Sequence, residues 1–183
     1  MSLARTRIAA RLLAVAALAA LTAGCFQPMY AEHTDGTPGL REKLMGVEVP
    51  PVDKPNASRE ARIQVEIRNA LAFKLYGNAT GMPPTHRLVL RFTSSRSSLM
   101  VDTNTGLPTS ENYGIDAQYN LIEIASNKSV MTGTTFSRVS YDMPGSYQRF
   151  SRNRAVRDAE DRAANEIAEN INTRLASFFT AGT

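Results

Sequence analysis

The spacing of apolar residues changes twice along the chain, and this change restricts the fold more than any other feature. Apolar residues recur at helical spacing over residues 58–76, alternate with polar residues between 86 and 141, and return to helical spacing over 152–179. A short alternating segment at 47–49 precedes the first helix. The sequence therefore predicts an α+β domain of order β-α-β-β-β-α, with two helices packed on one face of a four-stranded sheet.

Several boundaries of these segments carry residues that start or stop regular structure. Ser58 is a suitable N-cap for the first helix, and Gly77 is a suitable C-terminal stop. Residues 102–106 and 126–128 are predicted turns between the alternating segments. A meander of the three alternating segments would place the end of the last strand beside the turn at 102–106.

The N-terminus has the pattern of an export signal. Residues 1–11 carry three arginines, and residues 12–21 are continuously apolar. A positive segment followed by an apolar run of this length is typical of a secretory signal peptide. The run is shorter than the roughly 20 residues that span a bilayer, so a short transmembrane anchor is the alternative. We expect residues 1–24 to be a signal peptide that is removed.

The chain has one cysteine, Cys25, directly after this region. The preceding Thr22, Ala23 and Gly24 resemble the lipobox of bacterial lipoproteins, although Thr22 stands where leucine is preferred. A buried free thiol is the alternative. We expect lipidation at Cys25, because this cysteine directly follows the apolar run and the lipobox-like residues. Three acyl chains would attach the protein firmly to a membrane. Resemblance to these lipoproteins implies transfer to the outer membrane, because Phe26 stands where Asp would favour retention in the inner membrane.

The composition of the whole chain is that of an ordinary globular protein. Hydrophobic residues make up 43% of the chain and charged residues 21%. Without residues 1–24 the formal charge of +4 falls to +1, with 18 basic and 17 acidic residues. We therefore expect no nucleic-acid partner, and any anion must bind at a local cluster. The predicted organisation is a signal peptide over 1–24, a lipidated tether over 25–46 and one domain over 47–180.

The sequence contains no convincing catalytic or metal-binding set. His33 lies in the predicted tether and His86 opens a strand, and neither has a metal partner at helix or hairpin spacing. Residues 102–106 are similar to the start of a calcium loop, but the glycine comes one place early and Tyr113 replaces the bidentate glutamate. We expect no enzymatic activity, no metal and no cofactor.

One local basic cluster remains as a candidate binding site. The cluster consists of Arg149, Arg152 and Arg154, where the last strand meets the long helix. In the predicted meander this junction lies at the same end of the sheet as the hairpin turn at 102–106. Arginine side chains suit phosphate because their donors form a planar fork. An ordinary solvated loop is the alternative. Arg96 and Lys128 are weaker candidates, since Lys128 lies at the other end of the meander.

Four segments of the chain resemble the lipopolysaccharide-assembly lipoproteins of the LptE family. They are 24–30 (GCFQPMY), 68–71 (RNAL), 119–121 (YNL) and 158–164 (DAEDRAA). The first is similar to the family's start, G-C-G-F-x-P-L-Y, with one glycine absent. The resemblance covers nearly all of the mature chain, and the order of helices and strands is its stronger part.

This resemblance implies a function in binding rather than catalysis. Such lipoproteins sit in the periplasmic leaflet of the outer membrane, plug and help assemble the LptD β-barrel, and aid delivery of lipopolysaccharide to the cell surface. They place basic residues near the hairpin tip and before the last helix. The present chain matches only the second position, through its three clustered arginines, because Asp102, Thr103 and Asn104 at the tip offer no cation.

Two other functions stay open from the sequence. An accessory lipoprotein of a phospholipid-trafficking ABC transport system would also use a small α+β domain. A lipoprotein hydrolase would need a catalytic set, which the sequence does not provide. Recovery of a large β-barrel with the chain would favour the first function over both.

Overall fold

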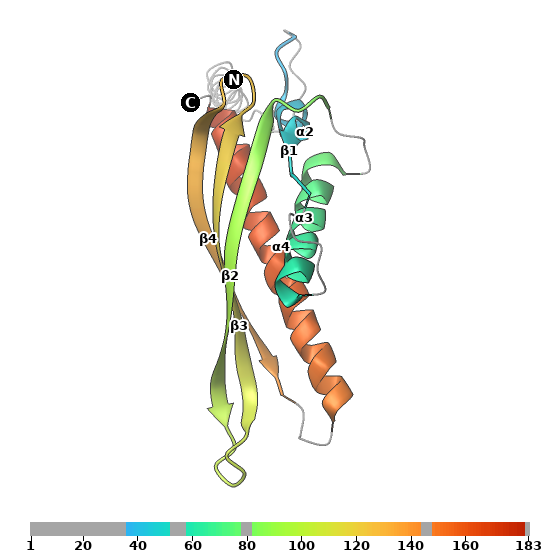
Figure 1. The fold of residues 1–183 in the computed structure, drawn as a ribbon, viewed down its shortest axis with the longest axis vertical. Helices are drawn as coiled ribbons and strands as arrows, with labels where there is room; N and C mark the ends of the chain where they lie inside the picture. The colour runs from blue at the N-terminus through green and yellow to red at the C-terminus, as the bar shows by residue number, and fades with distance from the viewer. Residues whose placement is uncertain (1–35, 52–57, 78–81, 144–147, 182–183) are drawn as a thin grey trace, which may run out of the picture. The chain divides into compact units, whose positions relative to one another are not determined.

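The computed structural model describes residues 36–51, 58–77, 82–143 and 148–181. The chain divides into two units, Met1–Gly39 and Leu40–Thr183, and the second holds all the described helices and strands. In chain order these are α2 (Leu40–Met45), β1 (Val47–Glu48), α3 (Arg59–Tyr76), β2 (His86–Val101), β3 (Pro108–Glu123), β4 (Lys128–Asp142) and α4 (Arg149–Ala181) (Figure 1). The predicted α+β class and element order are confirmed, with α2 as an addition.

The strands form one sheet in the order β1-β2-β3-β4. β1 pairs in parallel with the start of β2, so α3 is the crossover between two parallel strands. β2, β3 and β4 form the predicted antiparallel meander. Ser110 pairs with Met100 on one side and with Asp142 on the other, so β4 ends at the same end of the sheet as the β2–β3 hairpin. The predicted position of the last strand is therefore correct.

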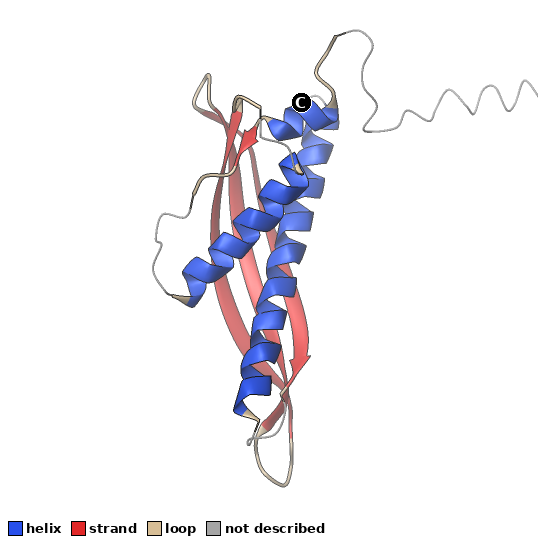
Figure 2. Ribbon diagram, turned by 90° about the vertical axis from the view of Figure 1, so that its right-hand side faces the viewer, coloured by secondary structure: helices blue, strands red, loops and turns tan. Residues whose placement is uncertain are grey.

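Both long helices pack on one face of this sheet (Figure 2). The predicted inward face of β3 is buried against them, and it consists of Tyr113, Ile115, Ala117, Tyr119 and Leu121. Four alanines of α4, namely Ala159, Ala163, Ala164 and Ala168, are 0% exposed. Small side chains at these positions let α4 approach its neighbours closely. The core is therefore a single layer between helices and sheet.

The first long helix, α3, begins and ends at its predicted capping residues. The backbone N–H of Ala61 donates to Ser58 Oγ at 3.1 Å, which satisfies one of the free N–H groups of the first turn. Gly77 has φ of +62°, a left-handed conformation that glycine adopts without steric cost. The Ser58 cap fixes the start of α3, where Arg59 and Arg62 form ion pairs with Glu160 of α4.

The predicted tether over 25–46 extends too far at its C-terminal end. Residues 40–45 form α2, and Leu40 and Leu44 are buried in the core. The Lys43 ammonium also donates to the carbonyl of Phe179 at 3.3 Å. The folded unit therefore begins at Leu40 rather than at residue 47. A helix of six residues has fewer than two turns, which is too short to show a period in the sequence.

One glycine of the sheet is required by close packing. Gly133 of β4 pairs directly with Tyr119 of β3, on the face that the helices cover. A Cβ atom at position 133 would overlap the Tyr119 ring. Glycine therefore lets the buried tyrosine lie flat against β4.

The described helices include none that is long and apolar enough to cross a membrane. The predicted signal peptide and the predicted lipidation site at Cys25 lie outside the described residues. Both stay predictions from the sequence.

Candidate functional site

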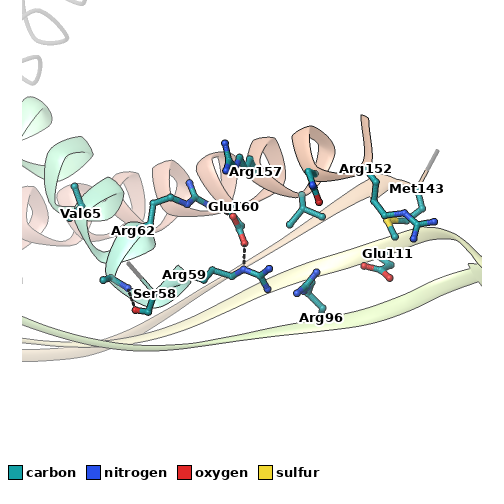
Figure 3. A pocket seen from close by; sticks show the side chains of 13 residues that line it. Ser58, Arg59, Arg62, Val65, Arg96, Glu111, Met143, Arg152, Arg157 and Glu160 are labelled. Atoms are coloured by element: carbon teal, nitrogen blue, oxygen red, sulfur yellow. Dashed lines mark hydrogen bonds and ion pairs between the residues drawn. The ribbon is translucent and has the colours of Figure 1, made fainter. Parts of the chain in front are cut away.

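A pocket of about 850 Å³ lies between the start of α3, the first half of α4 and the part of the sheet near the β2–β3 hairpin (Figure 3). Its walls consist of Ser58, Arg59, Ala61, Arg62 and Val65, then Arg96, Glu111 and Met143, and finally Arg152, Asn153, Val156, Arg157 and Glu160. Five of these residues are arginines and two are glutamates. The pocket therefore carries an excess of positive charge.

Two of the arginines are held by a buried carboxylate. Glu160 of α4 is 2% exposed, and its Oε1 lies 3.1 Å from Arg59 Nε, although without the alignment of a hydrogen bond. Arg62 pairs with Glu160 Oε2 and also with Asp161, the latter at 3.0 Å. Figure 3 shows the Arg59 and Glu160 side chains directed toward each other from α3 and α4. These ion pairs join the first turn of α3 to α4 and form one wall of the pocket.

A second group lies on the sheet side of the pocket. The hydroxyl of Tyr141 donates to Glu111, and Arg96 is bonded to the same hydroxyl. Burial raises the pKa of Tyr141 above its usual value, and the hydrogen bond and charge of Glu111 raise it further. The tyrosine therefore stays neutral at physiological pH and holds Glu111 at the pocket wall. Arg96 reaches this position because it pairs with Tyr113, a residue on the helix-facing side of the sheet.

The two remaining arginines come from the first turns of α4. Arg152 Nε is buried and has no hydrogen-bond partner among the described residues. No carboxylate of the described chain forms an ion pair with Arg152 or Arg157 within 4.0 Å. A buried charged donor without a partner is costly, by about 1–3 kcal/mol, unless a ligand satisfies it. These two guanidinium groups are the parts of the pocket most available to an anion.

Of the three predicted binding arginines, the structure places only Arg152 in the pocket. Arg149 and Arg154 are exposed and do not line it. For Arg154 the physical reason is helical geometry, because a step of two residues along α4 turns it away from the face that carries Arg152. Arg96, a weaker candidate from the sequence, does line the pocket, whereas Lys128 opens β4 at the other end of the sheet.

The sequence reasoning missed Arg59, Arg62 and Arg157. The first two lie about 90 residues before the arginines of α4, so only the packing of α3 on α4 brings the groups together. One signal was available for Arg96, because it lies an even number of residues from Leu88 and therefore shares its buried face. No comparable signal in the sequence marks the first turn of α3 as part of a site.

This arrangement can bind anions, because guanidinium groups dominate its walls. The pocket walls contain no histidine and no cysteine. Among the described residues no group of three or more His, Cys, Asp or Glu side chains could hold a metal ion. Guanidinium groups arranged around a cavity match the oxygens of phosphate or carboxylate ligands. The site is therefore a candidate for recognising a phosphorylated or carboxylated ligand.

Exposed apolar side chains lie at the hairpin end of the sheet, a few residues along the strands from Arg96 and Glu111 of the pocket. Leu99, Met100 and Val101 at the end of β2 are 53%, 65% and 53% exposed, and Leu107 after the hairpin turn is 46% exposed. Met100 follows closely after Ser98, which pairs with the pocket residue Glu111. A cationic pocket beside an apolar end suits a ligand that is anionic at one part and apolar at another.

Comparison with known families identifies the domain. Residues 44–175 match the lipopolysaccharide-assembly family, LptE. The chain belongs to the LptE family. The resemblance seen in four short segments of the sequence is therefore confirmed, and the protein is a lipoprotein of the lipopolysaccharide-assembly kind. No match was found among curated protein sequences.

Solved structures of two bacterial lipoproteins share the LptE-type fold of this chain. A candidate lipoprotein from Caulobacter crescentus CB15 has a TM-score of 0.59 at 21% identity, covering 79% of this chain and 97% of that chain. The rare lipoprotein B from Shewanella oneidensis has a TM-score of 0.50 at 14% identity, covering 72% of this chain and 92% of that chain. At these identities the likeness concerns the fold alone.

Proposed function

We propose that the protein is a lipid-anchored outer-membrane lipoprotein that plugs and helps assemble an LptD-like β-barrel and binds lipopolysaccharide on its way to the cell surface. Membership of the lipopolysaccharide-assembly family supports this function. The observation that carries the binding role is the arginine-lined pocket, in which Arg152 and Arg157 have no acidic partner among the described residues. The protein acts by binding, without a chemical step.

The proposed ligand has the chemistry that this end of the domain requires. Lipopolysaccharide carries phosphate groups next to several acyl chains. The guanidinium groups of Arg152 and Arg157 would take the phosphate oxygens, and the exposed Leu99 and Met100 offer apolar surface to the chains. Binding of phosphate would also satisfy the buried Nε of Arg152, which has no partner in the described part of the chain.

The proposed anchor is the acylated Cys25 after removal of residues 1–24. Three acyl chains hold a protein to a bilayer because each buried methylene contributes about 0.8 kcal/mol. The variant Cys25→Ser should accumulate as uncleaved precursor and take up no radiolabelled palmitate in growing cells. Normal cleavage and labelling of this variant would refute the lipidation site while leaving the family assignment intact.

Capture of the intact lipidated chain tests the proposed partner. A C-terminal affinity tag on the full chain, followed by mild detergent solubilisation of the membranes, should recover a large outer-membrane β-barrel protein in equal amount. A tagged outer-membrane lipoprotein of another family serves as the control. Recovery of inner-membrane ABC transporter subunits in place of the barrel would refute the proposal and favour the phospholipid-trafficking alternative.

A further inference from the structure

The sheet face opposite the helices is not covered by any described element. Figure 2 shows α3 and α4 on the same face of the sheet. Side chains alternate between the two faces of a strand, so those on the other face point away from both helices. These side chains form cross-strand rows, of which the central one is Arg91, Gln118 and Thr134. We call this surface the outer sheet face. Its two neighbouring rows are Val89, Asn120 and Thr132 on one side, and Thr93, Asp116 and Phe136 on the other.

The outer sheet face is polar but nearly neutral. Most of its side chains are hydroxyls or amides. Rows further along the face add Arg87, opposite Ile122, and Arg138, opposite Gly114, to Arg91. Two of these three arginines are paired. Arg87 bonds Glu48 at 3.0 Å, and Arg138 bonds Asp116 at 2.7 Å. Only Arg91 of these three forms no ion pair with another described residue.

The exposed side of α4 is different, because charged side chains dominate it. They are Arg154, Arg157, Asp158, Arg162, Glu166, Glu169 and Arg174. Charged residues are depleted at the centres of protein interfaces, where their hydration would be lost. The charge distribution therefore favours the outer sheet face over α4 as the surface that a protein partner covers.

Arg138, Asp116 and Phe136 form a connected cluster at one side of the central row. The side chain of Arg138 lies over Gly114, where a Cβ atom would be only 3.1 Å from Arg138 Cδ and Nε. Its guanidinium donates to the carbonyl of Ile115 at 3.2 Å and to both carboxylate oxygens of Asp116 at 2.7 and 2.9 Å. It also lies 5.6 Å from the ring centre of Phe136, which is 66% exposed. An exposed aromatic ring fixed in place loses little entropy on binding, which is typical of interface anchors.

Two hollows meet at the central row. One has a volume of about 480 Å³ and the other about 320 Å³, and Arg91, Gln118 and Thr134 line parts of both. Side chains from an apposed protein surface can fill hollows of this size. The unpaired Arg91 calls for a carboxylate on that surface.

We propose that the outer sheet face is the surface of this protein that packs against the inner wall of the outer-membrane β-barrel, with an acidic residue of the wall opposite Arg91. This inference rests on the proposed function. The lumen of such barrels is polar, so hydroxyl and amide groups of the sheet find hydrogen-bond partners there. The arginine-lined pocket lies between the helices and the sheet, and contact through the outer sheet face leaves it open to its ligand.

Site-specific photo-crosslinking in intact cells tests this placement. The photoreactive amino acid p-benzoylphenylalanine replaces Gln118 or Thr134 on the outer sheet face, and replaces Asn165 or Thr173 on the exposed side of α4 as matched controls. We expect adducts with the barrel from both sheet positions and much weaker ones from the α4 positions. Adducts from the α4 positions alone, or adducts with twice the mass of this chain, would overturn the proposal.

A charge placed in the central row gives an independent readout. Thr134→Arg should lower the amount of barrel recovered with the tagged chain by about tenfold or more, because an unpaired charge would be desolvated in the contact. Thr173→Arg on α4 is the control and should leave recovery unchanged. If the unmodified chain recovers no barrel, the proposed function fails. If it recovers the barrel and Thr134→Arg does so equally well, only the assignment of this face fails.

Discussion

Replacement of Arg152 by methionine tests the candidate pocket most directly. Its Nε is buried without a partner in the described part of the chain, although it lines a pocket rich in guanidinium groups. Methionine keeps much of the aliphatic volume and removes the donors. A hydrogen bond to a charged group contributes about 1.5–3 kcal/mol. We therefore expect Arg152→Met to weaken lipopolysaccharide binding by about 10- to 150-fold.

The matched control is Arg154→Met, two residues further along α4. Arg154 is exposed and does not line the pocket, yet its loss changes the net charge of the chain by the same amount. Titration of each variant into purified lipopolysaccharide in detergent, followed by calorimetry, measures both affinities. A loss confined to Arg152→Met supports the pocket, and the loss should diminish at high salt because charges contribute to it.

Stability separates a binding effect from a folding defect. Arg152→Met removes a buried donor that is unsatisfied among the described residues, so urea unfolding should show equal or greater stability than the parent chain. Unchanged affinity in Arg152→Met, or an equal loss in Arg154→Met, would show that the pocket does not hold the ligand. A strongly destabilised Arg152→Met would show that this donor has a structural partner.

Three further predictions concern the folded domain. Gly133→Ala should destabilise it by about 1–3 kcal/mol in urea unfolding, because a methyl group overlaps the Tyr119 ring; stability equal to the parent would contradict the packing. Burial lowers the pKa of His86 in the folded state. The contribution of His86 to the free energy of unfolding should therefore be complete above a pH of about 6.5, the usual histidine pKa, and decline as the pH falls below it. His86→Gln should flatten that decline. Arg62→Ala should lower the free energy of unfolding more than Glu160→Gln does, because Arg62→Ala leaves the buried Glu160 carboxylate with one partner fewer. In Glu160→Gln the two arginines can turn to water. The opposite order of stabilities would refute this account.

The sequence predicted the fold well where a pattern repeats over many residues. The alternation at Tyr113, Ile115 and Ala117 identified the buried face of β3, and Ser58 and Gly77 identified both ends of α3. The prediction failed at α2, where residues 40–45 are too few to show a period. There only the burial of two leucines against distant parts of the chain reveals that the folded unit has begun.

The candidate pocket was predicted less completely, for a different physical reason. Neighbours in sequence suggested Arg149, Arg152 and Arg154 as one cluster, but α4 turns Arg154 onto a different face from Arg152, and Arg149 does not line the pocket either. The structure places only Arg152 of these in the pocket and adds Arg59, Arg62 and Arg157, which the sequence did not suggest.

The sequence alone determined the class of the domain, the order of its elements and the family resemblance, because these follow from local periodicity and short motifs. It also carries the prediction of lipidation at Cys25, which depends on the residues around it and on no folded structure. Only the tertiary structure decided which arginines share a pocket, since residues about 90 positions apart meet through the packing of α3 on α4. It confirmed that both helices pack on one face of the sheet, and it alone decided which residues share a cross-strand row on the other face, because those rows depend on strand register.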